Sequence, residues 1–256
     1  MRLLCPVCGR QLTRKENTAV CENRHSFDYA RQGYVNLLIS QTKDHGDNKA
    51  MVLARTSFLN TGAYAFLKET IAEEVQKAAP SVLCDLGCGE GYYTAALPCP
   101  EKYGFDLSRD ALKHASSHDK STQYCIAGIF HLPVMDECCD FALTCFAPFA
   151  KEEVQRILKK DGLFLFVTPG PDHLMELKSL LYEHPYQNAV DPLDTELSLQ
   201  KEYTITQAFH ADHDALMNLF QMTPYAYRTG KEGKEKLEKQ PGMDLTAQFV
   251  IRIFRK

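Results

Sequence analysis

The chain has 256 residues, of which 45% are hydrophobic and 24% are charged. This composition excludes a disordered or collagen-like chain, and the length suits one large or two small domains with a real core. The formal net charge of -4 at pH 7 disfavours a uniformly basic, non-specific nucleic-acid binder.

Ten cysteines are more than we expect of a protein this size that is kept in a reducing compartment. The N-terminal residues contain no apolar run of signal-peptide length, and the longest apolar run, Leu163–Val167, is too short to cross a bilayer. We therefore predict a cytoplasmic protein with no membrane segment. Its cysteines should be metal ligands, core residues or reactive thiols rather than disulfides.

Residues 1–34 contain two pairs of potential metal ligands. Cys5 and Cys8 form a C-x2-C pair, and Cys21 and His25 form a C-x3-H pair twelve residues later. Zinc takes four such ligands in a tetrahedron, and a closed set of four protein ligands makes a structural site that supplies folding energy. The alternatives are chance among ten cysteines or a redox C-x2-C pair, which would leave Cys21 and His25 unexplained.

Basic and aromatic residues surround these predicted ligands. Unstacked RNA bases lie on aromatic rings and phosphates bind guanidinium groups, so the mixture favours RNA as the partner. Alternatively, each aromatic residue packs the module onto the next domain. Residues 1–45 carry a net charge of +3 and the remainder -7, which also favours an anionic partner for the N-terminal part. The basic residues around the predicted ligands are Arg10, Arg14, Lys15, Arg24 and Arg31, and the aromatic residues are Phe27, Tyr29 and Tyr34.

Residues 35–80 begin with a short apolar stretch, followed by a polar linker at 41–49. Apolar residues at helical spacing then predict one long helix from about Ala50 to Ala78, which Pro80 ends. From Val82 onward, short apolar runs alternate with helical patterns, as in a parallel α/β domain. We therefore divide the chain into a zinc module at 1–34, a linker and helical segment at 35–80, and an α/β domain at 81–256.

A glycine-rich turn follows the first predicted strand of that domain. The strand at 82–86 leads into Gly87, Gly89 and Gly91, and a helix is predicted from about Tyr92. Such a turn lets the backbone approach a nucleotide. Asp85 precedes this turn. The glycines follow a G-x-G-x-G pattern and not the G-x-G-x-x-G pattern of a dinucleotide fingerprint. An acid and a shorter turn favour a cationic, phosphate-free ligand such as S-adenosylmethionine.

The next predicted strand, Tyr103–Leu107, places Asp106 at its end. An acid there can accept both ribose hydroxyls of a nucleoside, although it could also simply begin a turn. Ser108 is the predicted N-cap of a helix that starts near Arg109. Further along the chain, the patterns predict a helix at 174–183, a strand at 199–209, a helix at 212–222, an exposed helix and turn at 230–242, and a strand at 245–254.

Four segments in this order resemble class I S-adenosylmethionine-dependent methyltransferases: DLGCGEG (85–91), GFDLS (104–108), AGIFHLPVMDECCDF (127–141) and VQRILKKDGLFLFVTPG (154–170). Together with CPVCGRQL, CENRHSFDYARQGYVNLL, TGAYAFL and TPGPDHLMELK, they make the chain resemble the bacterial 23S ribosomal RNA (guanine-N1)-methyltransferase family of the RlmA type. The resemblance extends from Cys5 to about Tyr227.

The resemblance implies a Rossmann-like, seven-stranded sheet whose final strand is antiparallel, with a small N-terminal zinc-binding module. It implies methyl transfer from S-adenosylmethionine to N1 of a guanine in a 23S rRNA hairpin, near the peptide exit tunnel, and it allows a homodimer. It also implies structural zinc on Cys5, Cys8, Cys21 and His25. With the acids and glycines above, the expected cofactor-binding residues are Tyr64, Asp85, Gly87, Gly89, Glu90, Gly91, Asp106 and His173.

Several of these assignments have structural alternatives. By periodicity alone Tyr64 would be a core residue, and His173 a polar residue in the first turn of a helix. Asp172 is a candidate base for the guanine N1 proton, but a carboxylate at a helix N-terminus is better explained by the helix dipole. The segment FAPF (146–149) could wall or stack on the target base. The remaining cysteines are predicted to be reduced, structural thiols: Cys84, Cys88, Cys99, Cys125, Cys138, Cys139 and Cys145.

Two other functions remain open at this stage. The same four segments occur in methyltransferases of small molecules, although a small substrate has no need of a basic zinc module. The chain could also be a non-catalytic, zinc-dependent RNA-binding adaptor, although the intact Asp85, glycine turn and Asp106 argue against a decayed cofactor site.

Overall fold

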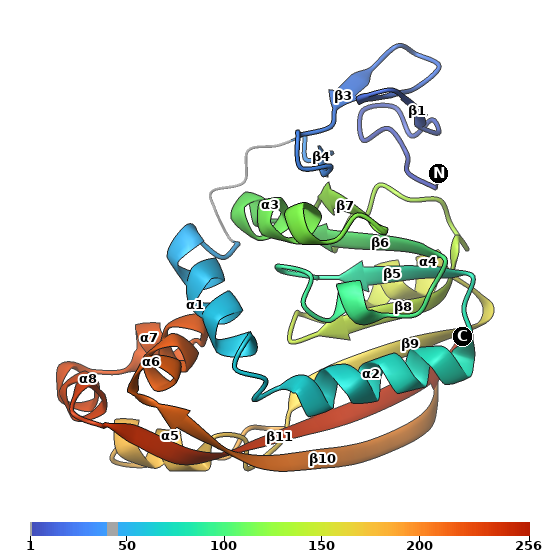
Figure 1. Ribbon diagram of the computed structural model, residues 1–256. Helices are drawn as coiled ribbons and strands as arrows, with labels where there is room; N and C mark the ends of the chain where they lie inside the picture. The colour runs from blue at the N-terminus through green and yellow to red at the C-terminus, as the bar shows by residue number, and fades with distance from the viewer. Residues whose placement is uncertain (1, 40–45) are drawn as a thin grey trace.

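The computed structural model describes residues 2–39 and 46–256, which form a small N-terminal sheet and a large sheet flanked by helices (Figure 1). The small sheet comprises β1 (Thr13–Lys15), β2 (Thr18–Val20) and β3 (Ser26–Asp28). The large sheet comprises β4 (Val35–Asn36), β5 (Val82–Leu86), β6 (Glu101–Asp106), β7 (Thr122–Ile126), β8 (Cys139–Cys145), β9 (Leu158–Pro169), β10 (Ser198–Asp212) and β11 (Gly242–Arg255). The helices are α1 (Lys49–Leu59), α2 (Ala65–Ala78), the 3-10 turn η1 (Thr94–Ala96), α3 (Arg109–His118), α4 (Lys151–Ile157), α5 (Met175–Leu181), α6 (His213–Met222), α7 (Tyr225–Arg228) and α8 (Lys231–Glu238).

The large sheet has the strand order β10-β11-β9-β8-β5-β6-β7-β4. Strand β11 is antiparallel to both of its neighbours, whereas β4 through β9 pair in parallel. The predicted fold class is therefore confirmed, including the antiparallel final strand. An eighth strand joins the expected seven because β4, which directly follows the N-terminal module, pairs with β7 at the edge of the sheet.

Strand β5 lies in the centre of this sheet and is buried along its whole length. Alternate side chains of a strand point to opposite faces, so a central parallel strand is apolar on both. Val82 and Cys84 pack in a cluster with α4 and the N-terminal module, and Leu83 packs in a second cluster with α2, α5 and α6. The carboxyl end of β5 is thereby held between two packed layers.

The prediction of one helix over residues 50–78 is wrong. The chain forms α1 and α2, separated by a turn in which Gly62 has φ +82°. That left-handed conformation favours glycine and ends the helical path. The apolar spacing survives the break, because Phe58 and Leu67 are buried in the same cluster. The first part of the predicted linker, up to residue 45, lies outside the described residues.

The predicted helix from about Tyr92 is also wrong, since only the short 3-10 turn η1 follows the glycine loop. Pro98 and Pro100 come directly afterwards. Proline offers no backbone N–H and disfavours a helical conformation in the residue before it, so a helix cannot extend here. A phosphate at this loop would therefore gain no support from a helix dipole, which agrees with the prediction of a phosphate-free ligand.

The other predicted elements are confirmed with small shifts in their bounds. The Ala111 backbone N–H donates to Ser108 Oγ at 3.1 Å, which makes Ser108 the N-cap of α3. Strands β6, β10 and β11 and helices α5, α6 and α8 correspond to the patterns found along the chain. Among the described residues, no helix is both long enough and apolar enough to span a membrane.

Candidate zinc centre and cofactor site

The four predicted zinc ligands lie together in the N-terminal module. Cys5 Sγ is 3.4 Å from His25 Nδ1, Cys21 Sγ is 3.5 Å from the same atom, and Cys8 Sγ is 3.7 Å from Cys21 Sγ. All four donor atoms lie within 4.8 Å of one another. Thiolates about 2.3 Å from a tetrahedral zinc ion lie roughly 3.8 Å apart, so this arrangement fits zinc.

The turns that carry these ligands require special backbone conformations. Gly9, after Cys8, has φ +70°, and Arg24, before His25, has φ +61°. Hydrogen bonding from the backbone of Arg10 helps to lower the pKa of the Cys8 thiol to about 6. A thiol that is largely ionised at neutral pH is the form that binds metal.

The aromatic residues of the module pack inward, whereas its basic residues face solvent. Tyr29 is buried beneath Arg14, whose guanidinium carbon lies 4.2 Å from the ring centroid. Phe27 packs against the core cluster that contains Val82 and Cys84, and Tyr34 packs against the cluster around α3 and β7. The exposed bases are Arg10, Arg14, Lys15, Arg24 and Arg31. The structure thus favours packing for the aromatics and leaves a basic surface for an anionic partner.

The glycine loop follows β5 at the carboxyl edge of the sheet, and its three glycines have positive φ angles. A Cβ on Gly87 would lie 2.4 Å from Cβ of Ala147, and one on Gly91 would lie 2.6 Å from Tyr124 Oη. By contrast, a Cβ on Gly89 would have only Arg55 Nη1 as a neighbour among the described residues, at 3.9 Å. Gly87 and Gly91 therefore let the loop pack against the protein, and Gly89 faces more open space.

Asp106 ends β6 beside this loop, as predicted from its spacing. Its carboxylate accepts from the backbone N–H of Gly89 at 2.9 Å and of Ser108 at 2.7 Å. Burial raises the pKa of Asp106, although these two N–H groups oppose the shift. The carboxylate is thus held rigidly next to the loop and keeps lone pairs for further donors.

Asp85 is buried at the end of β5, where Thr94 Oγ1 donates to its Oδ2 at 2.5 Å. Burial, reinforced by the charge of Asp106, raises the pKa of Asp85 to about 7. Among the described residues, Asp85 Oδ1 and Glu90 Oε1 have no hydrogen-bond partner although both atoms are buried. Buried polar atoms are normally satisfied, so these two fit a ligand that brings its own donors, as S-adenosylmethionine does.

Glu90 belongs to an ionic cluster that our sequence analysis missed. Arg55 of α1 pairs with Asp47, and its Nη1 lies 3.5 Å from Glu90 Oε2. The position of Arg55 in α1 could have indicated this cluster, because Arg55 lies at helical spacing from the buried residues Val52 and Leu59. A base on the buried face of a helix indicates an internal ion pair. Its partners could not be inferred because they lie outside the helix.

Tyr64 and His173 also come together, although they are far apart in the sequence. Tyr64 Oη is 3.4 Å from His173 Nε2, and both residues are buried. Burial lowers the pKa of His173 to about 3, and its Nδ1 accepts from the backbone N–H of Gln248 at 3.2 Å. His173 is therefore neutral, with its proton on Nε2 facing Tyr64.

An aromatic group connects this pair with the end of β8. The ring of Phe249 lies 5.0 Å from Tyr64, 4.8 Å from His173 and 5.2 Å from Phe146. Phe146 itself has φ +62°, is 43% exposed, and lies 6.2 Å from Tyr93. Tyr64 and His173 thus form a wall behind the carboxyl edge of the sheet, and Phe146 is its exposed aromatic residue.

Asp172, the candidate base, is exposed and accepts a hydrogen bond from Gln187 Nε2 at 2.7 Å. Two residues later, Leu174 precedes α5, so the structure leaves the helix-dipole explanation of Asp172 in place.

Three further thiols, those of Cys84, Cys138 and Cys139, lie within 4.8 Å of one another and are completely buried. They lie on β5 and at the start of β8, among the core side chains of the face that the N-terminal module covers. This is the position expected of structural thiols.

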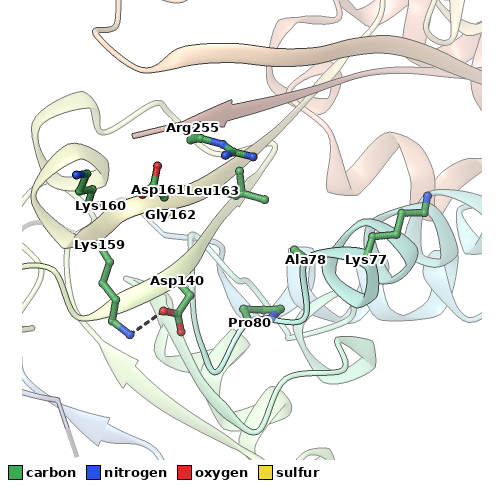
Figure 2. A pocket seen from close by; sticks show the side chains of 10 residues that line it. All are labelled: Lys77, Ala78, Pro80, Asp140, Lys159, Lys160, Asp161, Gly162, Leu163 and Arg255. Atoms are coloured by element: carbon green, nitrogen blue, oxygen red, sulfur yellow. Dashed lines mark hydrogen bonds and ion pairs between the residues drawn. The ribbon is translucent and has the colours of Figure 1, made fainter.

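A cavity of about 380 Å³ lies at the other end of the sheet (Figure 2). Its lining includes Asp140, Lys159 and Arg255, and Lys159 Nζ is 2.7 Å from Asp140 Oδ1. Asp140 also accepts from the backbone N–H of Val82, where β5 begins. Because the glycine loop follows the opposite end of β5, this cavity is separate from the candidate cofactor site.

Comparisons with known proteins agree with this arrangement. Residues 3–45 match the family described as "RlmA, N-terminal", and residues 84–166 match the family described as "Methyltransferase domain". The structure of a "Putative Type II Methyltransferase" from Anaeromyxobacter dehalogenans covers 73% of this chain and 94% of its own, with a TM-score of 0.53 and 18% identity. That likeness shows the methyltransferase fold.

Curated relatives match almost the whole chain. A "23S rRNA (guanine(748)-N(1))-methyltransferase" from Streptomyces fradiae is 33% identical over 99% of this chain and 96% of its own length. A "Putative 23S rRNA (guanine-N(1)-)-methyltransferase YxjB" from Bacillus subtilis is 28% identical over 98% of this chain and 96% of its own. Together with the N-terminal match, these relatives show that the chain belongs to the RlmA-type family of S-adenosylmethionine-dependent 23S rRNA (guanine-N1)-methyltransferases.

Proposed function

We propose that this protein transfers the methyl group of S-adenosylmethionine to N1 of a guanine in a hairpin of 23S rRNA. The observation that carries the proposal is the near-complete match to a relative named for that reaction, in a chain whose zinc-ligand group and glycine loop are both intact. The basic surface of the N-terminal module supports an RNA substrate, because a small molecule has no need of it.

In this proposal Cys5, Cys8, Cys21 and His25 hold a structural zinc ion that folds the N-terminal module. The backbone of Leu4 donates to Pro133 O at 2.7 Å, so the module is also attached to the catalytic sheet. Zinc orders the surface that carries the basic residues, and phosphate contacts from that surface would position the hairpin.

Asp106 would accept the ribose hydroxyls of the cofactor, and Asp85 and Glu90 would receive its cationic groups. S-adenosylmethionine supplies a methyl carbon that is activated by its sulfonium. The chain's residues then have to align the guanine N1 with that carbon and sulfur, which is catalysis by orientation. Gly89 would let the loop backbone approach the cofactor, and Gly87 and Gly91 would hold that loop close to the protein. Tyr64 and His173 would support the cofactor from behind.

The target guanine must leave its stack to reach the site, and an unpaired hairpin base does so at least cost. Phe146 is an exposed aromatic ring at the carboxyl edge of the sheet, on which such a base could stack. The guanine N1 proton must also leave, to water or to a carboxylate such as Asp172. Ribosomal RNA as substrate is the reason to propose a cytoplasmic location, and two copies acting on one hairpin would form a homodimer.

The decisive experiment incubates the full-length protein with methyl-labelled S-adenosylmethionine and transcripts of 23S or 16S rRNA. We expect label in 23S rRNA alone, and a reverse-transcription stop beside one guanine, because a methyl group on N1 blocks Watson–Crick pairing. Asp85→Asn should abolish both signals. A protein that binds the cofactor but leaves 23S rRNA unlabelled, both as naked RNA and in ribosomal precursors, would show that the proposed substrate is wrong.

A further inference from the structure

The ionic cluster around Arg55 connects three parts of the chain. Asn48 caps the N-terminus of α1, and Asp47 O accepts from Ser108 Oγ at 2.6 Å, which fastens the start of α1 to the end of β6. From α1, Arg55 reaches back to Asp47 and across to Glu90 in the glycine loop. Its Nη2 also lies 3.4 Å from Met222 O at the end of α6. The guanidinium is therefore held beside the loop from several sides.

This position is strongly acidic. Asp47, Asp85, Glu90 and Asp106 all lie at or beside the glycine loop, and Arg55 is the base that pairs with two of them. Burial opposes the charge of Arg55, but the hydrogen bond that Arg55 donates to Asp47 and the charges of Glu90 and Asp106 outweigh this effect and raise the pKa of Arg55. The side chain stays cationic although it is only 23% exposed.

The chemistry of the ligand makes this cation significant. S-adenosylmethionine carries a sulfonium, an α-ammonium and an α-carboxylate. Clustered carboxylates attract the first two groups and repel the third, so the site needs a cation where the carboxylate lies. A guanidinium binds a carboxylate through two parallel hydrogen bonds, which a point charge cannot reproduce.

Two observations place the amino-acid end of the ligand next to Arg55. The space beside Gly89 is open, with Arg55 Nη1 as its one close neighbour among the described residues. In addition, Glu90 Oε1 is buried without a hydrogen-bond partner in the part of the chain that the structure describes, while Glu90 Oε2 faces Arg55. An ammonium donating to Glu90 Oε1 would bind the same carboxylate that pairs with the guanidinium through Oε2.

We propose that Arg55 binds the α-carboxylate of S-adenosylmethionine and that Glu90 receives its α-ammonium, so that one protein ion pair recognises the zwitterion of the ligand. The assignment rests on the cofactor site proposed above. It makes α1, which lies outside the methyltransferase match at residues 84–166, a part of the cofactor site.

The test compares two ligands that differ by a single carboxylate. Calorimetric titration of the full-length protein would measure the affinity of S-adenosylmethionine and of its decarboxylated analogue, for wild type and for Arg55→Gln. Loss of a charge-assisted, bidentate contact should weaken S-adenosylmethionine by roughly 10- to 100-fold. The affinity of the decarboxylated analogue should stay the same or rise slightly, because it has no group for Arg55 to bind.

Arg55→Lys provides a second variant that keeps the positive charge and the packing of α1 but cannot make two parallel hydrogen bonds to a carboxylate. Its preference for S-adenosylmethionine over the decarboxylated analogue should be smaller than that of wild type. Its affinity for the analogue should be unchanged. Lys49→Gln is the matched control, because it removes an exposed positive charge from the same helix and should change neither affinity.

Failure of the Arg55 assignment and failure of the proposed cofactor site would give different results. If Arg55→Gln and Arg55→Lys weaken both ligands equally, Arg55 only fastens α1 to the loop, and the proposal is overturned. If the wild-type protein binds neither ligand, the cofactor site itself is wrong, whatever the variants do.

Discussion

Asp85 shows how one buried carboxyl can be tuned by its surroundings. It ends a strand that is apolar on both faces, so burial favours its neutral form, and the charge of Asp106 acts in the same direction. Its Oδ1 has no hydrogen-bond partner within residues 2–39 and 46–256, while Thr94 donates to the other oxygen. A cationic ligand would supply the missing interaction and stabilise the ionised form.

We therefore predict a pH dependence of cofactor binding. The pKa of Asp85 is about 7 in the folded protein. Between about pH 4 and pH 7 the folded state holds a proton that the unfolded state has lost, so the contribution of Asp85 to stability falls as the pH rises. The ionised carboxylate binds the cation, so the Asp85-dependent part of the affinity should rise about tenfold from pH 6 to pH 8.

Calorimetry at several pH values would measure this effect. Dividing the affinity of wild type by that of Asp85→Asn removes the titration of the ligand's own ammonium. Asp110→Asn, which neutralises an exposed carboxylate on α3, should keep the wild-type profile. A wild-type to Asp85→Asn ratio that is constant with pH would contradict the assignment.

Gly87 and Gly62 allow a matched comparison of two glycines. Their φ angles are +83° and +82°, so alanine at either position meets the same backbone strain. At Gly87 the new Cβ would also collide with Ala147, whereas at Gly62 none of the described residues would lie within 4 Å of it. Gly87→Ala should therefore lose about 1–3 kcal/mol more stability than Gly62→Ala.

Urea denaturation of both variants would measure this difference. Gly87→Ala should also weaken cofactor binding, because the loop must shift away from the end of β8 to relieve the collision. Equal losses of stability in the two variants would show that the loop does not need this close approach.

At the scale of elements, the N-terminal module depends on metal and on docking together. Its three strands have three residues each, and several of its residues belong to the core cluster of the catalytic domain. So small a sheet cannot supply its own stability, and zinc would provide the rest. Strand β4 extends the link, since it leaves the module and enters the large sheet beside β7.

Cys8→Ser should remove the bound zinc and disorder this module. We expect the zinc content, measured by mass spectrometry, to fall to zero and the RNA affinity to fall by at least roughly tenfold as the basic surface loses its order. Cofactor affinity should stay within about threefold, because β5 and the glycine loop pack in the body of the large sheet.

Cys99→Ser is the control, since Cys99 is a half-buried thiol in a loop of the catalytic domain. It should retain the full zinc content and RNA affinity. If Cys8→Ser lost zinc and still bound RNA as wild type does, the module would not be the RNA-binding part.

At the scale of the whole molecule, the single net charge of -4 conceals an asymmetry. The basic N-terminal part is attached at the β4 edge of the large sheet (Figure 1). The remainder of the chain is acidic, and several of its acids lie at the glycine loop. An anionic RNA would be attracted at one end, and a cationic ligand at the centre. The composition therefore excludes a uniformly basic binder without excluding RNA.

Much of this organisation could be predicted from residues that are close in sequence. The two zinc-ligand pairs, the strand and glycine turn at 82–91, the cap at Ser108 and the antiparallel final strand involve short-range chemistry or a family resemblance. The two incorrect helices had local causes as well. The positive φ of Gly62 and the missing N–H of Pro98 interrupt the helical backbone, although apolar residues continue at helical spacing on either side.

The amino-acid sequence by itself determined the fold class, the donor set for zinc and the acids beside the glycine turn, because each depends on spacing within one element or one turn. Only the tertiary structure decided that β4 joins the large sheet, that Tyr64 meets His173, and that Arg55 reaches Glu90. These are contacts between side chains or strands from distant segments. They depend on how the elements pack, which a local pattern does not encode.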